Sequence, residues 1–106
     1  MNRARLELAA KVLTEYTGDF DILDWEQCAV GILSKSEQFP FLEWDWAGRP
    51  VYYEGDVERY GWGAVVSCFS IDMDTAFKLF LYDHVVTKHG VIEAINHLLE
   101  KGYVDA

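Results

Sequence analysis

The chain has 106 residues, of which 51% are hydrophobic and 15% aromatic, and it carries a formal net charge of −9. This size and composition predict a single globular domain over residues 1–106 and exclude a disordered chain, which lacks enough apolar residues to form a core. No stretch approaches the ~18 consecutive apolar residues of a membrane-spanning helix. The first residues do not resemble a signal peptide, so we expect a cytoplasmic protein.

The negative charge is concentrated in residues 15–58. That segment holds eleven acidic and two basic residues, for a net charge of −9, whereas the rest of the chain holds seven of each. An acidic segment opposes binding to nucleic acid or to an anionic membrane surface, because both select basic proteins. It favours a basic surface of another protein as the partner.

Two helices are expected in the first third of the chain. Apolar residues with i, i+3, i+4, i+7 spacing predict a helix over residues 3–16. They are Leu6, Ala9, Ala10 and Leu13. A second helix is expected to begin at Asp24 as its N-cap, because Gln27 three residues later completes a capping box. This helix should end near residues 34–36.

The spacing of apolar residues changes to a period of two over residues 41–53, which predicts one β-hairpin with a turn at residues 47–48. Alternation places one set of side chains toward the core and the other toward solvent. The core set is Leu42, Trp44 and Trp46, and the outward set is Glu43 and Asp45. Because a lone hairpin is marginal in water, we expect it to lie on the helices.

Three further helices are expected after the hairpin. Asp56 is a candidate N-cap for the first, although the glycines at 61 and 63 allow that helix to begin only at Trp62. Asp72 is the expected N-cap of the next helix, and the last should begin near residue 87 and end before Gly102. The expected fold is mainly α, of the α+β class. About five helices pack around the central pair in residues 61–86, with one β-hairpin near 41–53.

Two groups of residues carry a resemblance to known proteins. Residues 25–31 read W-x-x-C-A-V-G, and residues 69–95 combine F-x-I, A-x-x-L-F and a T…V-I…I helix. Together they resemble small uncharacterised bacterial and phage proteins in which a W…CxxG helix precedes similar helical segments. The resemblance covers about half of the chain. It implies a fold and an origin in a mobile element, and it implies no chemistry.

Catalytic and metal-binding patterns are weak in this sequence. Cys28 and Cys68 lie among apolar residues, which favours burial over a role as nucleophile. His84, His89 and His97 match no zinc-ligand spacing. We therefore expect no catalytic residue, no metal site and no cofactor. Two alternatives stay open: a small enzyme that uses Cys28 or a histidine, and a homo-oligomeric scaffold that uses the aromatic hairpin.

The leading hypothesis is a non-enzymatic interaction protein with an acidic surface. Tyrosine and tryptophan beside charged residues are typical of interfaces, and spaced carboxylates can take the place of phosphates in a nucleic-acid-binding groove. A phage inhibitor of the anti-CRISPR or anti-restriction type, directed at a nucleic-acid-handling protein, would present such a surface. The residues expected to contact the partner are Asp19, Asp21, Asp24, Glu26, Glu43, Asp45, Tyr53, Glu54, Asp56 and Glu58.

Overall fold

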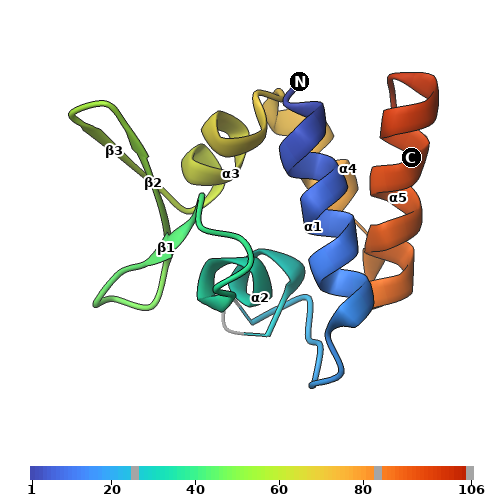
Figure 1. Ribbon diagram of the computed structural model, residues 1–106, viewed down its shortest axis with the longest axis horizontal. Helices are drawn as coiled ribbons and strands as arrows, with labels where there is room; N and C mark the ends of the chain where they lie inside the picture. The colour runs from blue at the N-terminus through green and yellow to red at the C-terminus, as the bar shows by residue number, and fades with distance from the viewer. Residues whose placement is uncertain (25–26, 83–84, 105–106) are drawn as a thin grey trace.

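The computed structural model describes residues 1–24, 27–82 and 85–104 (Figure 1). Within these ranges the chain forms five α-helices and three β-strands. The helices are α1 (Arg3–Glu15), α2 (Ala29–Lys35), α3 (Trp62–Phe69), α4 (Met73–Phe80) and α5 (Lys88–Lys101). The strands are β1 (Glu43–Trp44), β2 (Pro50–Glu54) and β3 (Val57–Tyr60). The expected α+β class with mainly helical content is confirmed.

Helix α1 occupies the middle of the helical body and runs beside α5 (Figure 1). The apolar stripe predicted for α1 is buried, and Leu6 and Leu13 have no exposed surface. Helices α2 and α3 pack on other sides of α1. The Arg3 guanidinium donates a hydrogen bond to the backbone oxygen of Leu99 in α5 at 2.8 Å. The first and last helices thus belong to one hydrophobic core.

Helices α3 and α4 contribute the aromatic part of that core. The Phe69 ring lies 5.7 Å from the ring of Phe39 and 5.8 Å from the ring of Phe80. The Trp62 ring meets the ring of Phe77 edge-on, with the centroids 5.1 Å apart. Rings at these separations attract one another beyond the effect of their burial. The α3–α4 pair is therefore held by ring packing.

The ends of α4 and α5 follow the sequence signals. The Asp72 carboxylate accepts a hydrogen bond from the Thr75 N–H at 2.7 Å. Hydrogen bonding from the Thr75 side chain, and then from its N–H, lowers the pKa of Asp72. The Thr87 hydroxyl accepts from the Gly90 N–H at 3.0 Å. Gly102 ends α5 with a φ of 85°, a left-handed conformation that glycine adopts without strain. All three residues were expected to lie at helix ends.

Arg5 connects α1 to the sheet and to α3. Its guanidinium donates to the Tyr52 hydroxyl at 3.2 Å and to the Cys68 backbone oxygen, in the last turn of α3, at 2.9 Å. It also lies 4.4 Å from the centroid of the Phe41 ring. Charge-assisted hydrogen bonds and a cation–π contact here bind three elements that are far apart in the sequence.

The start of the second helix differs from the prediction. Helix α2 begins at Ala29, and its N-cap is Cys28, which makes no side-chain cap bond. The backbone oxygen of Asp24 accepts from the N–H groups of Gln27 at 2.9 Å and of Cys28 at 2.8 Å. Because Asp24 closes a turn ahead of the helix in this way, the predicted capping box is wrong.

The sheet has three antiparallel strands in the order β1–β2–β3, where the sequence predicted one hairpin. Gly55 and Asp56 form the two-residue loop between β2 and β3, and the φ of Gly55 is 63°, as such loops favour. The role of Asp56 as a helix N-cap is therefore wrong. Helix α3 begins at Trp62, the later of the two expected starts.

Trp46 is not on the core side of the sheet. Its side chain is 98% exposed, although Leu42 is buried as predicted. Strand β1 ends at Trp44, because the Asp45 carboxylate accepts from the N–H groups of Ala47 at 2.9 Å and of Arg49 at 2.8 Å. This turn replaces the predicted strand, so the alternation that would have buried Trp46 does not reach it.

Candidate interaction surface

The side of the sheet that faces away from the core gathers side chains from all three strands. Directly paired residues of antiparallel strands point to the same face. The register pairs Val51 with both Glu43 and Tyr60, and Tyr53 with Glu58. Three residues of the β1–β2 turn border the same surface. We name it the outer sheet face; its residues are Glu43, Asp45, Trp46, Arg49, Val51, Tyr53, Glu58 and Tyr60.

A hollow of about 390 Å³ lies on the outer sheet face. Its floor is Val51, which is 2% exposed, and it is bordered by Trp46, Tyr53 and Tyr60. The two tyrosines are 51% and 40% exposed. Several large aromatic side chains left open to solvent around one hollow are typical of a surface that another molecule covers.

Carboxylates flank these aromatic rings. Glu58 accepts a hydrogen bond from the Tyr60 hydroxyl, and this bond raises the pKa of Tyr60. Partial loss of hydration, followed by the negative charges of Glu58, Glu43 and Asp45, raises the pKa of Tyr53. Both phenols therefore stay neutral at physiological pH, and the negative charge of the face comes from its three carboxylates.

Arg49 shows which kind of group this face holds. Its guanidinium lies 4.7 Å from the centroid of the Tyr60 ring and forms an ion pair of 3.2 Å with Asp45. A cation is thus bound between an aromatic ring and a carboxylate. Glu43 and Glu58 form no ion pair within the described part of the chain, so their charges are not balanced by a neighbouring cation.

Six of the residues expected to contact a partner come from the sheet region. The four that lie on the outer sheet face are Glu43, Asp45, Tyr53 and Glu58. By alternation Glu54 points to the opposite face, where it pairs with Arg59 at 3.7 Å. Asp56 lies at the tip of the β2–β3 hairpin. Of these six, four therefore share one surface.

The other four expected residues precede α2. Asp19, Asp21 and Asp24 lie in the connection between α1 and α2, which runs below α2, whereas the β2–β3 hairpin projects at the upper left (Figure 1). The Asp21 carboxylate accepts from the Leu23 N–H at 3.0 Å, which holds the local turn. Glu26 lies outside the described residues. The described acidic residues before α2 thus do not form one continuous patch with the acidic residues of the sheet.

Sequence reasoning did not place Trp46, Arg49 or Tyr60 among the partner-binding residues. Trp46 was assigned to the core, and Tyr60 was not assigned to a strand. The signal that could have found β3 is the Gly-Asp pair at 55–56, which separates two short runs rich in valine and tyrosine. Recognising that second hairpin would have placed Tyr60 beside Val51.

The two cysteines are buried, as the sequence predicted. Burial raises the pKa of Cys28, and it raises the pKa of Cys68 to about 11. A thiol must ionise to act as a nucleophile. Both side chains therefore stay protonated near neutral pH, which opposes the enzyme alternative that uses Cys28.

The two described histidines, His89 and His97, give no support to a catalytic or metal role. His89 faces Glu93 at 2.9 Å on the surface of α5, and the ring of His97 packs edge-on against the ring of Tyr103. His84 lies outside the described residues. Across residues 1–24, 27–82 and 85–104, no group of three histidine, cysteine, aspartate or glutamate side chains is placed to hold a metal ion.

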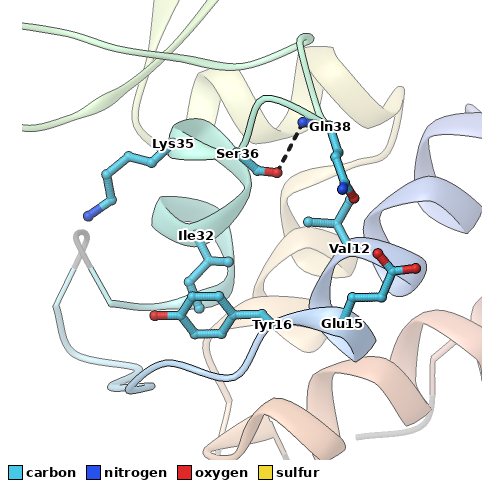
Figure 2. Close-up of a pocket in the computed structure, with 7 residues that line it drawn as sticks. All are labelled: Val12, Glu15, Tyr16, Ile32, Lys35, Ser36 and Gln38. Carbon is cyan, nitrogen blue, oxygen red and sulfur yellow. Dashed lines mark hydrogen bonds between the residues drawn. The ribbon is translucent and has the colours of Figure 1, made fainter.

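A second hollow, of about 430 Å³, lies between the end of α1 and α2 (Figure 2). The buried side chains of Val12 and Ile32 line it, and the ring of Tyr16 closes one side. Figure 2 shows Lys35 directed away from Glu15. The polar groups of this hollow thus do not converge on one point, as the groups of a catalytic site would.

Comparisons of the chain with protein-family models, curated proteins and solved structures found no match. The resemblance to small bacterial and phage proteins stays a prediction. None of the described helices is long and apolar enough to cross a membrane.

Proposed function

We propose that the protein is a binding module whose outer sheet face docks on a basic surface of another protein. The observation that carries the proposal is the exposure of Trp46, Tyr53 and Tyr60 around one hollow flanked by carboxylates. Exposed aromatic residues are the side chains from which interfaces gain most of their binding energy. Carboxylates around them attract a basic partner and orient its approach.

The face favours lysine and arginine side chains from the partner. Arg49 already binds in this way, between the Tyr60 ring and Asp45. Glu43 and Glu58 lie beside Tyr53 and form no ion pair with another described residue, so an arriving guanidinium or ammonium group would meet the same combination of ring and carboxylate. Phosphate groups would be repelled, which disfavours nucleic acid as the direct ligand.

A protein that handles nucleic acid is the narrower candidate for the partner. Such proteins carry basic grooves, and the carboxylates of the outer sheet face would occupy the places of phosphates in one. In this role the protein is an inhibitor that competes with nucleic acid, of the anti-CRISPR or anti-restriction type. Its support is the charge of the face.

The test uses the wild-type protein to capture partners from the host and then compares charge reversals on the purified complex. Glu58→Lys changes the outer sheet face, and Asp19→Lys is the matched control in the connection after α1. We expect Glu58→Lys to weaken binding by about tenfold or more and Asp19→Lys to change it little. Trp46→Ala should weaken binding at least as much as Glu58→Lys.

Salt gives an independent readout on the same complex. Raising the ionic strength should weaken binding by the wild type, because exposed charges are screened beyond a Debye length of about 8–10 Å. Circular dichroism of each variant checks that the fold is kept. A partner that binds Glu58→Lys and Trp46→Ala as tightly as the wild type would show that the outer sheet face is not the docking surface.

A further inference from the structure

Strand β3 is an edge of the sheet. It pairs with β2 on one side, and no other described strand pairs with it on the opposite side. All four of its residues are exposed. The β2–β3 hairpin projects away from the helices (Figure 1). The backbone along the outer side of β3 is therefore accessible to another chain.

The register identifies the backbone groups of β3 that are bonded to β2. Residues of an antiparallel ladder alternate between pairs that exchange hydrogen bonds and pairs that do not. The Gly61 N–H donates to the Pro50 oxygen at 3.0 Å, just beyond the end of β3. Because every second residue bonds to the neighbouring strand, the residues of β3 that are hydrogen-bonded to β2 are Arg59 and Val57.

Glu58 and Tyr60 therefore direct their N–H and C=O groups away from β2. These groups form the two donor and two acceptor positions of a free strand edge. The side chains of the same two residues belong to the outer sheet face. A chain that paired with this edge would consequently project every second side chain over the aromatic and acidic hollow.

We propose that this edge accepts an extended segment of the partner, rich in lysine or arginine, which adds to the sheet as a fourth strand beside β3. Strand addition to a free edge is a recurring mode of recognition, in which backbone hydrogen bonds give affinity and alternate side chains give specificity. The inference rests on the proposed function, since the added side chains contact the same outer sheet face. It adds the conformation that the partner must adopt.

Charge selects a basic segment over a second copy of this chain. The twofold pairings with the greatest overlap of two β3 strands place either the two Glu58 side chains or the two Arg59 side chains directly opposite each other. Like charges in that position are destabilising, and each chain adds a net charge of −9. A basic segment instead places lysine or arginine opposite Glu58.

The test compares two short fluorescent peptides that alternate lysine and threonine. The second peptide has the same sequence but carries N-methyl groups on the alternate backbone nitrogens that would face β3. N-methylation removes those hydrogen-bond donors and keeps the charges. We expect the wild-type protein to bind the unmodified peptide about tenfold or more tightly than the methylated one, measured by fluorescence anisotropy.

Two variants at one position separate the contribution of backbone pairing to peptide binding from the contribution of charge. Glu58→Pro removes the outward N–H at a place where an edge strand tolerates proline, whereas Glu58→Gln removes only the charge. We expect Glu58→Gln to weaken binding of both peptides and to keep the preference for the unmodified one. Glu58→Pro should reduce that preference, because the proline ring blocks the close approach of a paired strand at this position, although the outward C=O groups of the edge remain. Circular dichroism confirms that both variants keep the wild-type fold.

Equal binding of the two peptides, with a salt dependence that Glu58→Gln reduces, would overturn strand addition and leave the proposed function standing. Failure of both peptides to bind would also overturn strand addition, and the charge reversals on the captured complex would then decide the proposed function separately. Self-association of the wild type that Glu58→Pro abolishes would assign the edge to a second copy of the chain.

Discussion

The helical body and the sheet use aromatic residues in opposite ways. In the helical body the rings of Phe39, Phe69 and Phe80 pack on one another and are buried. On the outer sheet face Trp46 and Tyr53 stand exposed among carboxylates. The same residue class thus stabilises one region and is available for recognition in the other. Substitutions should therefore separate folding from binding along this division.

The largest expected effect is the difference in stability loss between substitution of a buried aromatic residue and substitution of an exposed one. Phe69→Ala should lower the free energy of unfolding by about 3–5 kcal/mol, because it leaves a cavity between two neighbouring rings. Trp46→Ala should change it by no more than about 0.5 kcal/mol, because the side chain is almost fully exposed. Urea denaturation measures both values. Similar losses in the two variants would contradict the division between the regions.

A middle-sized effect is expected where the two regions meet. Arg5→Gln removes the bonds to Tyr52 and to the Cys68 backbone oxygen, and should lower the free energy of unfolding by about 1–3 kcal/mol. Lys11→Gln, an exposed change on the same helix, should stay within about 0.5 kcal/mol. If urea denaturation gives the same value for both, Arg5 does not join the sheet to the helices.

The smallest effects are expected at opposite ends of the pH range. Because the pKa of Asp72 is lowered, its cap stabilises α4 fully at pH values above the ordinary pKa of 3.8. This stabilisation is lost as the pH falls through the folded-state pKa. Because the pKa of Tyr60 is raised, its hydrogen bond to Glu58 contributes fully at pH values below the ordinary pKa of 10.0. This contribution is lost as the pH rises through the folded-state pKa.

Thermal unfolding across the pH range measures both effects. The difference in Tm between the wild type and Asp72→Ala should shrink in acid and stay constant at neutral pH. The difference between the wild type and Glu58→Gln should shrink in alkali, where the Tyr60 phenol ionises. A Tm difference for Asp72→Ala that persists at the lowest pH would show that the ionised carboxylate is not what caps α4.

Much of the helical body could be predicted because its signals are local. The stripe of α1 follows from helical spacing, and Asp72 and Thr87 cap N–H groups only three residues away. Arg5 could not be predicted, because its partners lie 47 and 63 residues along the chain. Its sequence position, beside an apolar stripe, is that of an ordinary surface residue.

The outer sheet face was only partly predictable from the sequence. Acidic residues 43, 45 and 58 were assigned to partner binding from charge alone, and that charge also selected Asp19, which lies elsewhere. Strand β3 has charged residues at its centre and is exposed on both faces, so it lacks the alternation that identifies a half-buried strand. The turn at Asp45 depends on side-chain bonds that a spacing pattern does not report.

The pairing of α1 with α5 affects how the chain folds while it is being made. The hydrogen bond from Arg3 to Leu99 joins residues 96 positions apart. A ribosome adds roughly 5–20 residues per second, so α1 waits several seconds for its principal neighbour. During that interval Leu6 and Leu13 lack a complete core and are available to chaperones. Folding of the helical body therefore finishes only after α5 has left the ribosome.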